Sequence, residues 1–167
     1  MSLKIDIGCG IKESWHEPEG NPPSGEASWV RVDPYVEEAD LKAFAHDLPY
    51  KDGEVDEIFS SHTLEHISKF KIAETLKEWY RVLKPLGKLT VRVPDLEWCC
   101  NWWINHQTTG WDMDVLFGNQ SREGEVHLTG FNRQIMIDYL REAGFKIEKF
   151  EEMETHDQKT LSFECIK

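Results

Sequence analysis

Two glycines and two aspartates stand where they could hold a nucleoside. Gly8 and Gly10 follow a short apolar segment, and neither carries a Cβ that would keep a ligand away from its backbone N–H group. Asp33 lies 23 positions after Gly10 and ends a second apolar segment, where a carboxylate can accept two hydrogen bonds from a ribose diol. Asp47 follows a third segment and could accept a hydrogen bond from the exocyclic amine of adenine, beside an apolar wall formed by Leu48. The combination predicts an adenosyl ligand.

Other interpretations of these residues remain open. A nicotinamide dinucleotide site needs G-x-G-x-x-G, but its third glycine position is Glu13, which would place a carboxylate where the pyrophosphate approaches. This disfavours NAD, and no phosphate-binding Lys or Arg accompanies the glycines. Asp33 by itself could equally be a turn aspartate before Pro34.

The elements that must position these residues alternate between strands and connectors. A helix is predicted from Lys69 to Leu83, with Phe70 among its apolar positions, because apolar residues recur every three or four positions until Pro85 and Gly87. Such a rhythm predicts a parallel sheet whose ligand site lies beyond the carboxyl ends of its strands. The predicted strands are Leu3–Ile7, Trp29–Val32, Lys42–Ala45, Val55–Ser60 and Leu89–Val93.

The last third of the chain departs from this rhythm. Asn132 could cap a helix over Arg133–Ala143 that Gly144 ends, and two strands follow, Phe145–Phe150 and Leu161–Ile166. Their linker of about ten residues is too short for a typical helical crossover, so we expect an antiparallel hairpin at one edge of the sheet.

Two further segments lack a clear strand pattern. Prolines and glycines leave room for at most a short helix in residues 11–28. Residues 96–127 are interpreted as an insertion that could cap a pocket. Trp98 and Trp102 in this insertion could pack a helix on the sheet or form a dimer face, which is the favoured interpretation, or they could line a substrate wall.

Composition limits the class of partner. The 167 residues carry a net charge of −12, and a negative field of this size repels a phosphate backbone, so nucleic acid is not expected. No apolar run is long enough to span a membrane and no signal sequence begins the chain, which predicts a cytoplasmic protein without a membrane partner. The four cysteines form no C-x-x-C pair and are expected to be reduced thiols.

The motifs, taken in order, resemble those of class I S-adenosylmethionine-dependent methyltransferases, in particular a short subgroup of predicted methyltransferases. The resemblance covers about residues 3 to 150, and its specificity lies in the ordered set. The matching stretches are I-D-I-G-C-G from Ile5, V-R-V-D from Val30, H-D-L-P-Y-K-D-G-E-V-D-E-I from His46, S-S-H-T-L-E-H from Ser60, E-W-Y-R-V-L-K-P-L-G-K-L from Glu78, V-P-D from Val93 and H-L-T-G-F from His127.

The resemblance implies a Rossmann-like, doubly wound, mostly parallel α/β sheet with a C-terminal antiparallel hairpin, forming one domain over residues 1–167. It implies S-adenosylmethionine as cofactor. The fold and cofactor motifs do not identify the methyl acceptor, and because the charge argues against nucleic acid, a small-molecule or sugar-like acceptor is expected. By this resemblance, the methionine portion of the cofactor would be surrounded by Asp6, Gly8 and Gly10, and the ribose would be held by Asp33. Adenine would be held by Asp47 and Leu48, and the sulfonium end would lie near Ser61 and His62.

The chain departs from the family at several positions. Lys12 stands at the third glycine of the first motif, and Leu86 at the first glycine of the usual K-P-G-G. The lid helices that normally precede the first strand are absent from this sequence, so the cofactor could be more exposed, bound weakly, or covered by a partner subunit, such as a second copy in a homodimer. If the acceptor is a hydroxyl, the candidate general bases are Asp95, His127 and then His62.

Two other functions compete with this interpretation. The sequence His62-Thr63-Leu64-Glu65-His66 matches H-x-x-E-H, which on a helix would place two imidazoles on one face to bind zinc in a metallopeptidase. It comes directly after a predicted strand, as the methyltransferase interpretation requires, so no metal is expected. A degenerate methyltransferase fold that binds partners without catalysis is the other alternative.

Overall fold

The computed structural model describes residues 2–10, 29–106, 111–154 and 158–167. The short helix considered for residues 11–28 lies outside the described residues. Six strands and four α-helices are described, with one 3₁₀ helix, η2. The elements run in the order β1 (Lys4–Ile7), β2 (Trp29–Val32), β3 (Val55–Ser61), η2 (Leu64–His66), α1 (Ile72–Val82), β4 (Leu83–Pro94), α2 (Leu96–His106), α3 (Trp111–Phe117), α4 (Arg133–Ala143), β5 (Lys146–Glu154) and β6 (Lys159–Ile166).

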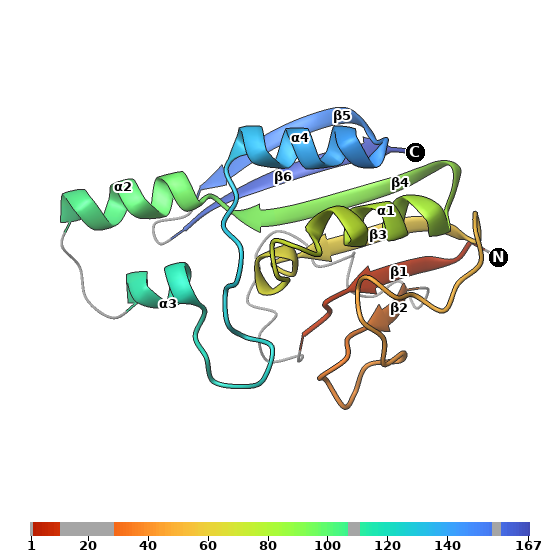
Figure 1. The fold of residues 1–167 in the computed structure, drawn as a ribbon, viewed down its shortest axis with the longest axis horizontal. Coiled ribbons are helices and arrows are strands. Elements are labelled where there is room, and N and C mark those ends of the chain that lie inside the picture. Colours follow the sequence, from red (N-terminus) through yellow and green to blue (C-terminus); the bar gives the residue numbers. More distant parts are fainter. Residues whose placement is uncertain (1, 11–28, 107–110, 155–157) are drawn as a thin grey trace.

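All six strands form a single sheet in the order β2-β1-β3-β4-β6-β5. The first four are mutually parallel, whereas β6 runs antiparallel to both of its neighbours, β4 and β5. The predicted fold class, a mostly parallel sheet with a C-terminal antiparallel hairpin, is therefore confirmed. Because the chain passes from β1 to β2 on one side and then returns to β3 on the other, a topological switch point lies at the carboxyl ends of β1 and β3 (Figure 1).

The predicted strand over Lys42–Ala45 is wrong. Only Leu41 forms an isolated bridge, with Val32, and the residues after it are turns and loop. The apolar alternation has another cause, because Ala45 and Leu48 enter the core from this loop. The carbonyl of Ala45 accepts a hydrogen bond from the indole N–H of Trp79 at 2.9 Å, so a side chain takes the place of a neighbouring strand.

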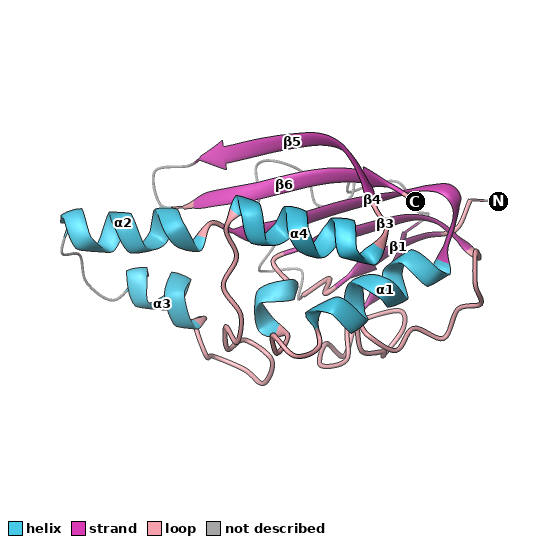
Figure 2. Ribbon diagram, turned by 45° about the horizontal axis from the view of Figure 1, so that its top comes forward, coloured by secondary structure: helices cyan, strands magenta, loops and turns pink. Residues whose placement is uncertain are grey.

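Helices α1 and α4 lie side by side on one face of the sheet (Figure 2). Helix α1 is shorter than predicted and starts at Ile72, after a turn closed by the Lys71 N–H to the Ser68 carbonyl at 2.7 Å. Phe70 therefore precedes the helix, and it is exposed rather than packed on the core. The prediction for α4 is confirmed at both ends: the Asn132 side chain accepts a hydrogen bond from the backbone N–H of Ile135, and Gly144 closes the helix in the left-handed conformation.

The insertion after β4 forms α2 and α3, which lie beyond the carboxyl end of β4 (Figure 1). Trp98 and Trp102 stack on each other in α2, with ring centroids 5.0 Å apart. At the opposite end of β4, Leu86 stands where the family's glycine is expected and takes a φ of 63°, a conformation that disfavours a side chain. Among the described residues, no helix has the length and apolar character needed to cross a membrane.

Candidate functional site

A pocket of about 1020 Å³ lies at the switch point. The carboxyl ends of β1, β2 and β3 all contribute to its wall, and the loop over residues 119–125 contributes from the insertion. Six of the ten residues predicted for the site line this pocket: Asp6, Gly8, Gly10, Asp33, Ser61 and His62. The other four, Asp47, Leu48, Asp95 and His127, do not.

The glycine turn after β1 is packed too tightly for any other residue at Gly8. Gly8 has a φ of 71°, and a Cβ built there would lie 2.1 Å from the hydroxyl oxygen of Thr63. The Thr63 hydroxyl donates to the Ile7 carbonyl at 3.0 Å, so it ties the end of β1 to the segment after β3. The backbone N–H of Gly8 donates to the Val32 carbonyl at 2.8 Å. The turn is thus fixed before any ligand arrives.

Asp33 uses one carboxylate oxygen to shape its own loop and directs the other toward the glycine turn. Oδ1 accepts hydrogen bonds from the backbone N–H groups of Tyr35 at 2.9 Å and Val36 at 3.1 Å. Oδ2 lies 3.3 Å from the N–H of Gly10. Both interpretations of Asp33 therefore have support, because the same carboxylate makes a turn and presents an oxygen beside the glycines.

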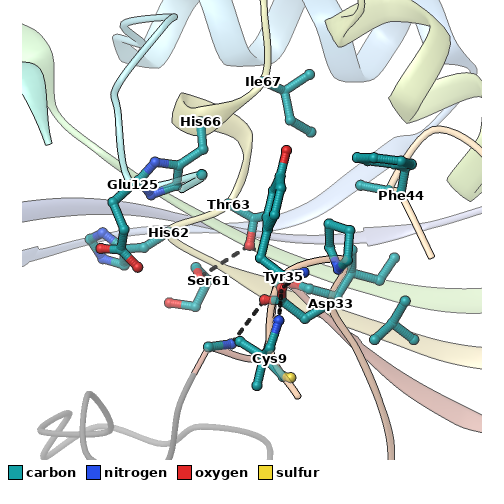
Figure 3. A pocket seen from close by; sticks show the side chains of 18 of the residues that line it. Cys9, Asp33, Tyr35, Phe44, Ser61, His62, Thr63, His66, Ile67 and Glu125 are labelled. Atoms are coloured by element: carbon teal, nitrogen blue, oxygen red, sulfur yellow. Dashed lines mark hydrogen bonds between the residues drawn. The ribbon is translucent and has the colours of Figure 1, made fainter. Parts of the chain in front are cut away.

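Two aromatic side chains form the apolar part of the wall, and the sequence analysis did not find them. Tyr35 and Phe44 meet edge to face with ring centroids 6.2 Å apart, and both are about half exposed. They project on the same side of the pocket, above Asp33 (Figure 3). Gly124 closes against Tyr35, since a Cβ there would lie 2.7 Å from the ring. Tyr35, three positions after the end of β2, was the available signal, whereas Phe44 lies inside the wrongly predicted strand over Lys42–Ala45.

Ser61 and His62 lie at the end of β3, facing the space between Asp33 and the insertion loop (Figure 3). Among the described residues, the Ser61 hydroxyl oxygen is buried with no hydrogen-bond partner, so it is available to a ligand. His62 has a φ of 53°. Its Nε2 lies 3.3 Å from the Thr160 hydroxyl and its Nδ1 lies 3.3 Å from a Glu65 carboxylate oxygen.

Burial changes the protonation of three groups around the pocket. Desolvation raises the pKa of Asp6 to about 7; Arg31 opposes this shift and Asp33 adds to it. Desolvation likewise raises the pKa of the Cys9 thiol to about 12, which makes it a poor nucleophile. Burial also acts to raise the pKa of Glu65, but the imidazole of His62, whose Nδ1 lies 3.3 Å away, and the charge of His66 outweigh it and hold that pKa below its ordinary value.

Asp47 and Leu48 follow Phe44 in the same loop but do not line the pocket. Asp47 is exposed, and Leu48 is buried in the core, with its backbone N–H donating to a Glu78 carboxylate oxygen at 2.9 Å. Their assignment to adenine stays a prediction. Phe44, Ala45 and His46 from the same loop line the pocket instead.

Asp95 and His127, two of the three candidate bases, have other partners. Asp95 caps α2, because its Oδ1 accepts hydrogen bonds from the N–H groups of Glu97 and Trp98 at 3.1 and 3.4 Å, and its Oδ2 lies 3.7 Å from the ammonium of Lys159. Nδ1 of His127 lies 2.9 Å from the Val115 carbonyl, and burial lowers the pKa of this imidazole. Of the three, His62 alone lines the pocket.

The peptidase arrangement of H-x-x-E-H is not formed. It requires both histidines on one helix, but His62 is in the left-handed conformation and lies before η2, which covers only Leu64–His66. The motif therefore forms the turn between β3 and η2 and does not present two imidazoles on one helical face.

Comparison with known proteins identifies the family. The sequence model of the methyltransferase domain matches residues 5–91, just over half of the chain. The chain belongs to the methyltransferase domain family. The resemblance to class I S-adenosylmethionine-dependent methyltransferases is thereby confirmed, whereas no curated protein matches the sequence.

Solved structures share the methyltransferase fold at low sequence identity. A SAM-dependent methyltransferase from Methanosarcina mazei has a TM-score of 0.66 at 17% identity, over 99% of this chain and 92% of that one. A possible histamine N-methyltransferase from Thermotoga maritima has a TM-score of 0.62 at 18% identity, over 100% and 83%. The 1,6-didemethyltoxoflavin-N1-methyltransferase of Burkholderia thailandensis, solved with S-adenosylhomocysteine, has a TM-score of 0.63 at 14% identity, over 99% and 71%.

The family and the fold both support S-adenosylmethionine as the cofactor, as the sequence predicted. The residues of the pocket fit such a ligand. The tight Gly8 turn lines the pocket, and Asp33 presents a carboxylate oxygen. Two aromatic rings supply an apolar wall, and the Ser61 hydroxyl has no partner among the described residues.

Proposed function

We propose that this methyltransferase transfers a methyl group from S-adenosylmethionine to a small polar acceptor bound beside His62. The observation that carries the proposal is the position of the pocket, at the switch point of the sheet, with the glycine turn and Asp33 on one side and polar side chains on the other. When bound, the cofactor supplies an electrophilic methyl group on a sulfonium, so holding the acceptor in line with it provides much of the acceleration.

The wall next to β1 and β2 would hold the cofactor. Oδ2 of Asp33 can accept ribose hydroxyls while Oδ1 keeps the loop in place. The rings of Tyr35 and Phe44 offer flat faces for a purine. Asp6, Gly8 and Gly10 would surround the methionine portion, where the positive charges of the cofactor favour the ionised form of Asp6.

The opposite wall would hold the acceptor. It is lined by His62, His66, Arg122 and Glu125, so it offers both donors and acceptors of hydrogen bonds. The volume of about 1020 Å³ is at the upper end of the range of small-molecule pockets, roughly 300–1,000 Å³, which leaves room for a small acceptor beside the cofactor. Residues 96–127 would serve as the cap, since residues 119 and 121–125 close this side.

His62 is the base that the geometry favours if the acceptor is a hydroxyl. It lines the pocket, and Nδ1 is held near the Glu65 carboxylate at 3.3 Å, an arrangement that would leave Nε2 as the proton acceptor. The net charge of −12 supports a small molecule over nucleic acid as acceptor, in a cytoplasmic enzyme.

The first experiment is a calorimetric titration with S-adenosylhomocysteine, comparing Asp33→Asn with wild type. The asparagine side chain would keep an oxygen for the Tyr35 and Val36 N–H groups, but its amide cannot accept the second ribose hydroxyl as a carboxylate does. We expect the affinity to fall by about 1.5–3 kcal/mol, roughly 10- to 150-fold. An affinity equal to wild type would contradict the cofactor site.

A second pair of variants separates the two candidate adenine sites. Phe44→Ala removes an aromatic wall of the pocket, and Asp47→Ala removes the exposed carboxylate beside it. We expect Phe44→Ala to weaken binding by about 1–3 kcal/mol through lost base stacking, and Asp47→Ala to bind as wild type does. Weaker binding by Asp47→Ala together with wild-type binding by Phe44→Ala would instead support Asp47 as the adenine-binding residue.

Transfer of a labelled methyl group to a panel of small acceptors then separates an enzyme from a binding module. Turnover that His62→Gln lowers, with cofactor affinity unchanged, supports the proposed base. Saturable cofactor binding with no transfer to any acceptor favours the degenerate fold that binds without catalysis.

A further inference from the structure

Glu65, His66 and His127 bring three potential metal ligands together at the edge of the pocket. One ligand atom from each residue lies within 4.8 Å of the others, and the two imidazole rings meet edge to face with centroids 4.8 Å apart. His66 also lines the pocket, on the side away from Tyr35 and Phe44 (Figure 3). None of the three serves the cofactor in the proposed function.

Both imidazoles are held in the tautomer that metal binding needs. Nδ1 of His66 lies 3.3 Å from the Val126 carbonyl, and Nδ1 of His127 lies 2.9 Å from the Val115 carbonyl. A carbonyl can only accept, so the proton of each neutral ring is on Nδ1 and the lone pair is on Nε2. Histidines that bind metals almost always donate their other ring N–H to such an acceptor.

Glu65 supplies the observation that points to a ligand. Its side chain is 2% exposed, and neither carboxylate oxygen has a hydrogen-bond partner among the described residues. The nearest basic atom is Nδ1 of His62, at 3.3 Å from Oε1. With no donor in hydrogen-bond geometry in the described part of the chain, both oxygens of this buried carboxylate have acceptor positions left for a cation or a donor.

The backbone fixes the two parts of the cluster against each other. The segment over residues 126–131, which we call the strap, runs from the insertion loop to α4 (Figure 1). The N–H groups of Leu128 and Thr129 both donate to the Glu65 carbonyl, at 2.7 and 3.0 Å, and the Thr129 hydroxyl donates to the Ile67 carbonyl at 2.6 Å. His127 is therefore held beside Glu65 and His66 by bonds that do not involve their side chains.

We propose that Glu65, His66 and His127 form a binding site for a divalent transition-metal cation. Two imidazole nitrogens and one carboxylate are the ligand set of open zinc sites, in which a fourth position is left for water or a ligand. The donor atoms of a tetrahedral site with bonds of about 2.0–2.2 Å stand roughly 3.4 Å apart. The three donor atoms, now up to 4.8 Å apart, would therefore move closer together when the cation binds. His62, with Nδ1 3.3 Å from Oε1 of Glu65, would help to orient the carboxylate.

Zinc and cobalt titrations test the site without any methyl acceptor. The protein is first freed of metal with a chelator, then titrated with Zn²⁺ by calorimetry and with Co²⁺ by visible absorption, which reports the coordination geometry. Wild type is compared with Glu65→Gln and His127→Asn, and with His46→Asn, a histidine variant in the loop that carries Phe44. Thermal unfolding with and without Zn²⁺ provides a second readout.

We expect one equivalent of Zn²⁺ to bind wild type and His46→Asn and to raise their melting temperatures. Glu65→Gln and His127→Asn should bind about tenfold more weakly or worse and lose the thermal shift. Glu65→Gln keeps the size of the side chain and removes its buried charge, so the metal-free variant is expected to fold. Wild type that binds no Zn²⁺, or binding that both ligand variants retain, would overturn the site and leave His62 as the partner of Glu65.

The two proposals fail independently. A variant that loses cofactor binding at the Asp33 wall can still be titrated with zinc, because the metal cluster shares no residue with that wall. A protein that binds S-adenosylhomocysteine but no metal would keep the proposed function and lose this site alone.

Discussion

The two walls of the pocket are held in different ways. On the Asp33 wall, the hydrogen bonds of Asp33 Oδ1 join residues that are close in sequence. This oxygen accepts from the N–H groups of Tyr35 and Val36, two and three positions away. On the histidine wall they join distant segments, since His66 and Val126 are 60 positions apart and His62 and Thr160 are 98 apart. The first wall needs β1 paired with β2 and the contact of Gly8 with Thr63 after β3, whereas the second needs the strap and the C-terminal hairpin in place.

The largest effect is expected from breaking the first wall at Gly8. Gly8→Ala puts a Cβ 2.1 Å from the Thr63 hydroxyl at a φ of 71°, so strain and overlap together should lower the free energy of unfolding by roughly 2–5 kcal/mol. Urea unfolding measures the loss, and cofactor affinity should fall with it.

Gly53→Ala is the matched control, because Gly53 has a φ of 66° but its Cβ would meet no atom closer than 4.0 Å. It isolates the conformational strain from the overlap. A second variant, Gly8→Ala with Thr63→Ala, should recover only the part of the overlap that comes from the Thr63 hydroxyl and methyl groups, because the Cβ of residue 63 would still lie 2.8 Å away. Equal losses in Gly8→Ala and Gly53→Ala would show that the contact with Thr63 is not what fixes the turn.

The difference between contacts that are close in sequence and contacts between distant segments also explains which features could be predicted from the sequence. Strand β2, the hairpin and both ends of α4 followed from local signals such as Asn132 and Gly144, whose side chain and φ act within a few positions. Asp6, Gly8, Gly10 and Asp33 reach one pocket because parallel strands place their carboxyl ends together.

The parts that were missed depend on contacts between distant segments. The Lys42–Ala45 segment has a strand's apolar pattern, but Trp79 satisfies the carbonyl that a neighbouring strand would have used. The meeting of His127 with Glu65 and His66 depends on the strap crossing to η2, and no spacing in the sequence encodes that crossing.

The second largest effect is expected on the pH dependence of stability, through the ionisation of Asp6 beside the Asp33 wall. The pKa of Asp6 is raised to about 7 in the folded protein, above 3.8 for the free group, because burial disfavours the carboxylate. The folded state therefore binds more protons between these values. The stabilising contribution of protonated Asp6 is fully present below about pH 4 and is lost as the pH rises through 7.

Asp6→Asn should remove this dependence, since asparagine stays neutral. The variant is expected to gain stability relative to wild type as the pH rises from 5 to 8, by at most about 2.7 kcal/mol, the value of the roughly two pH units between pH 5 and the folded pKa of about 7. Urea unfolding of both proteins across that range measures the difference. A difference that stays constant with pH would mean that Asp6 titrates normally in the folded state.

The smallest effect is expected on the histidine wall, at the strap. Thr129→Val removes the hydroxyl that donates to the Ile67 carbonyl at 2.6 Å and keeps the shape of the side chain. The loss should be about 1 kcal/mol of the free energy of unfolding. Thr75→Val is the control, because its hydroxyl makes a similar bond at 2.9 Å to the Lys71 carbonyl, in the first turn of α1 rather than at the strap.

Hydrogen exchange then distinguishes a local from a global change at the strap. The N–H groups of Leu128 and Thr129 both donate to the Glu65 carbonyl, so Thr129→Val should speed their exchange more than that of the amides in α4, whereas Thr75→Val should not. Cofactor affinity should stay at the wild-type value in both variants, because no residue of the Asp33 wall is bonded to the strap among the described contacts. Exchange that rises equally in the strap and in α4 would mean that the strap opens only together with the rest of the domain, and the local role given to the Thr129 hydroxyl would fail.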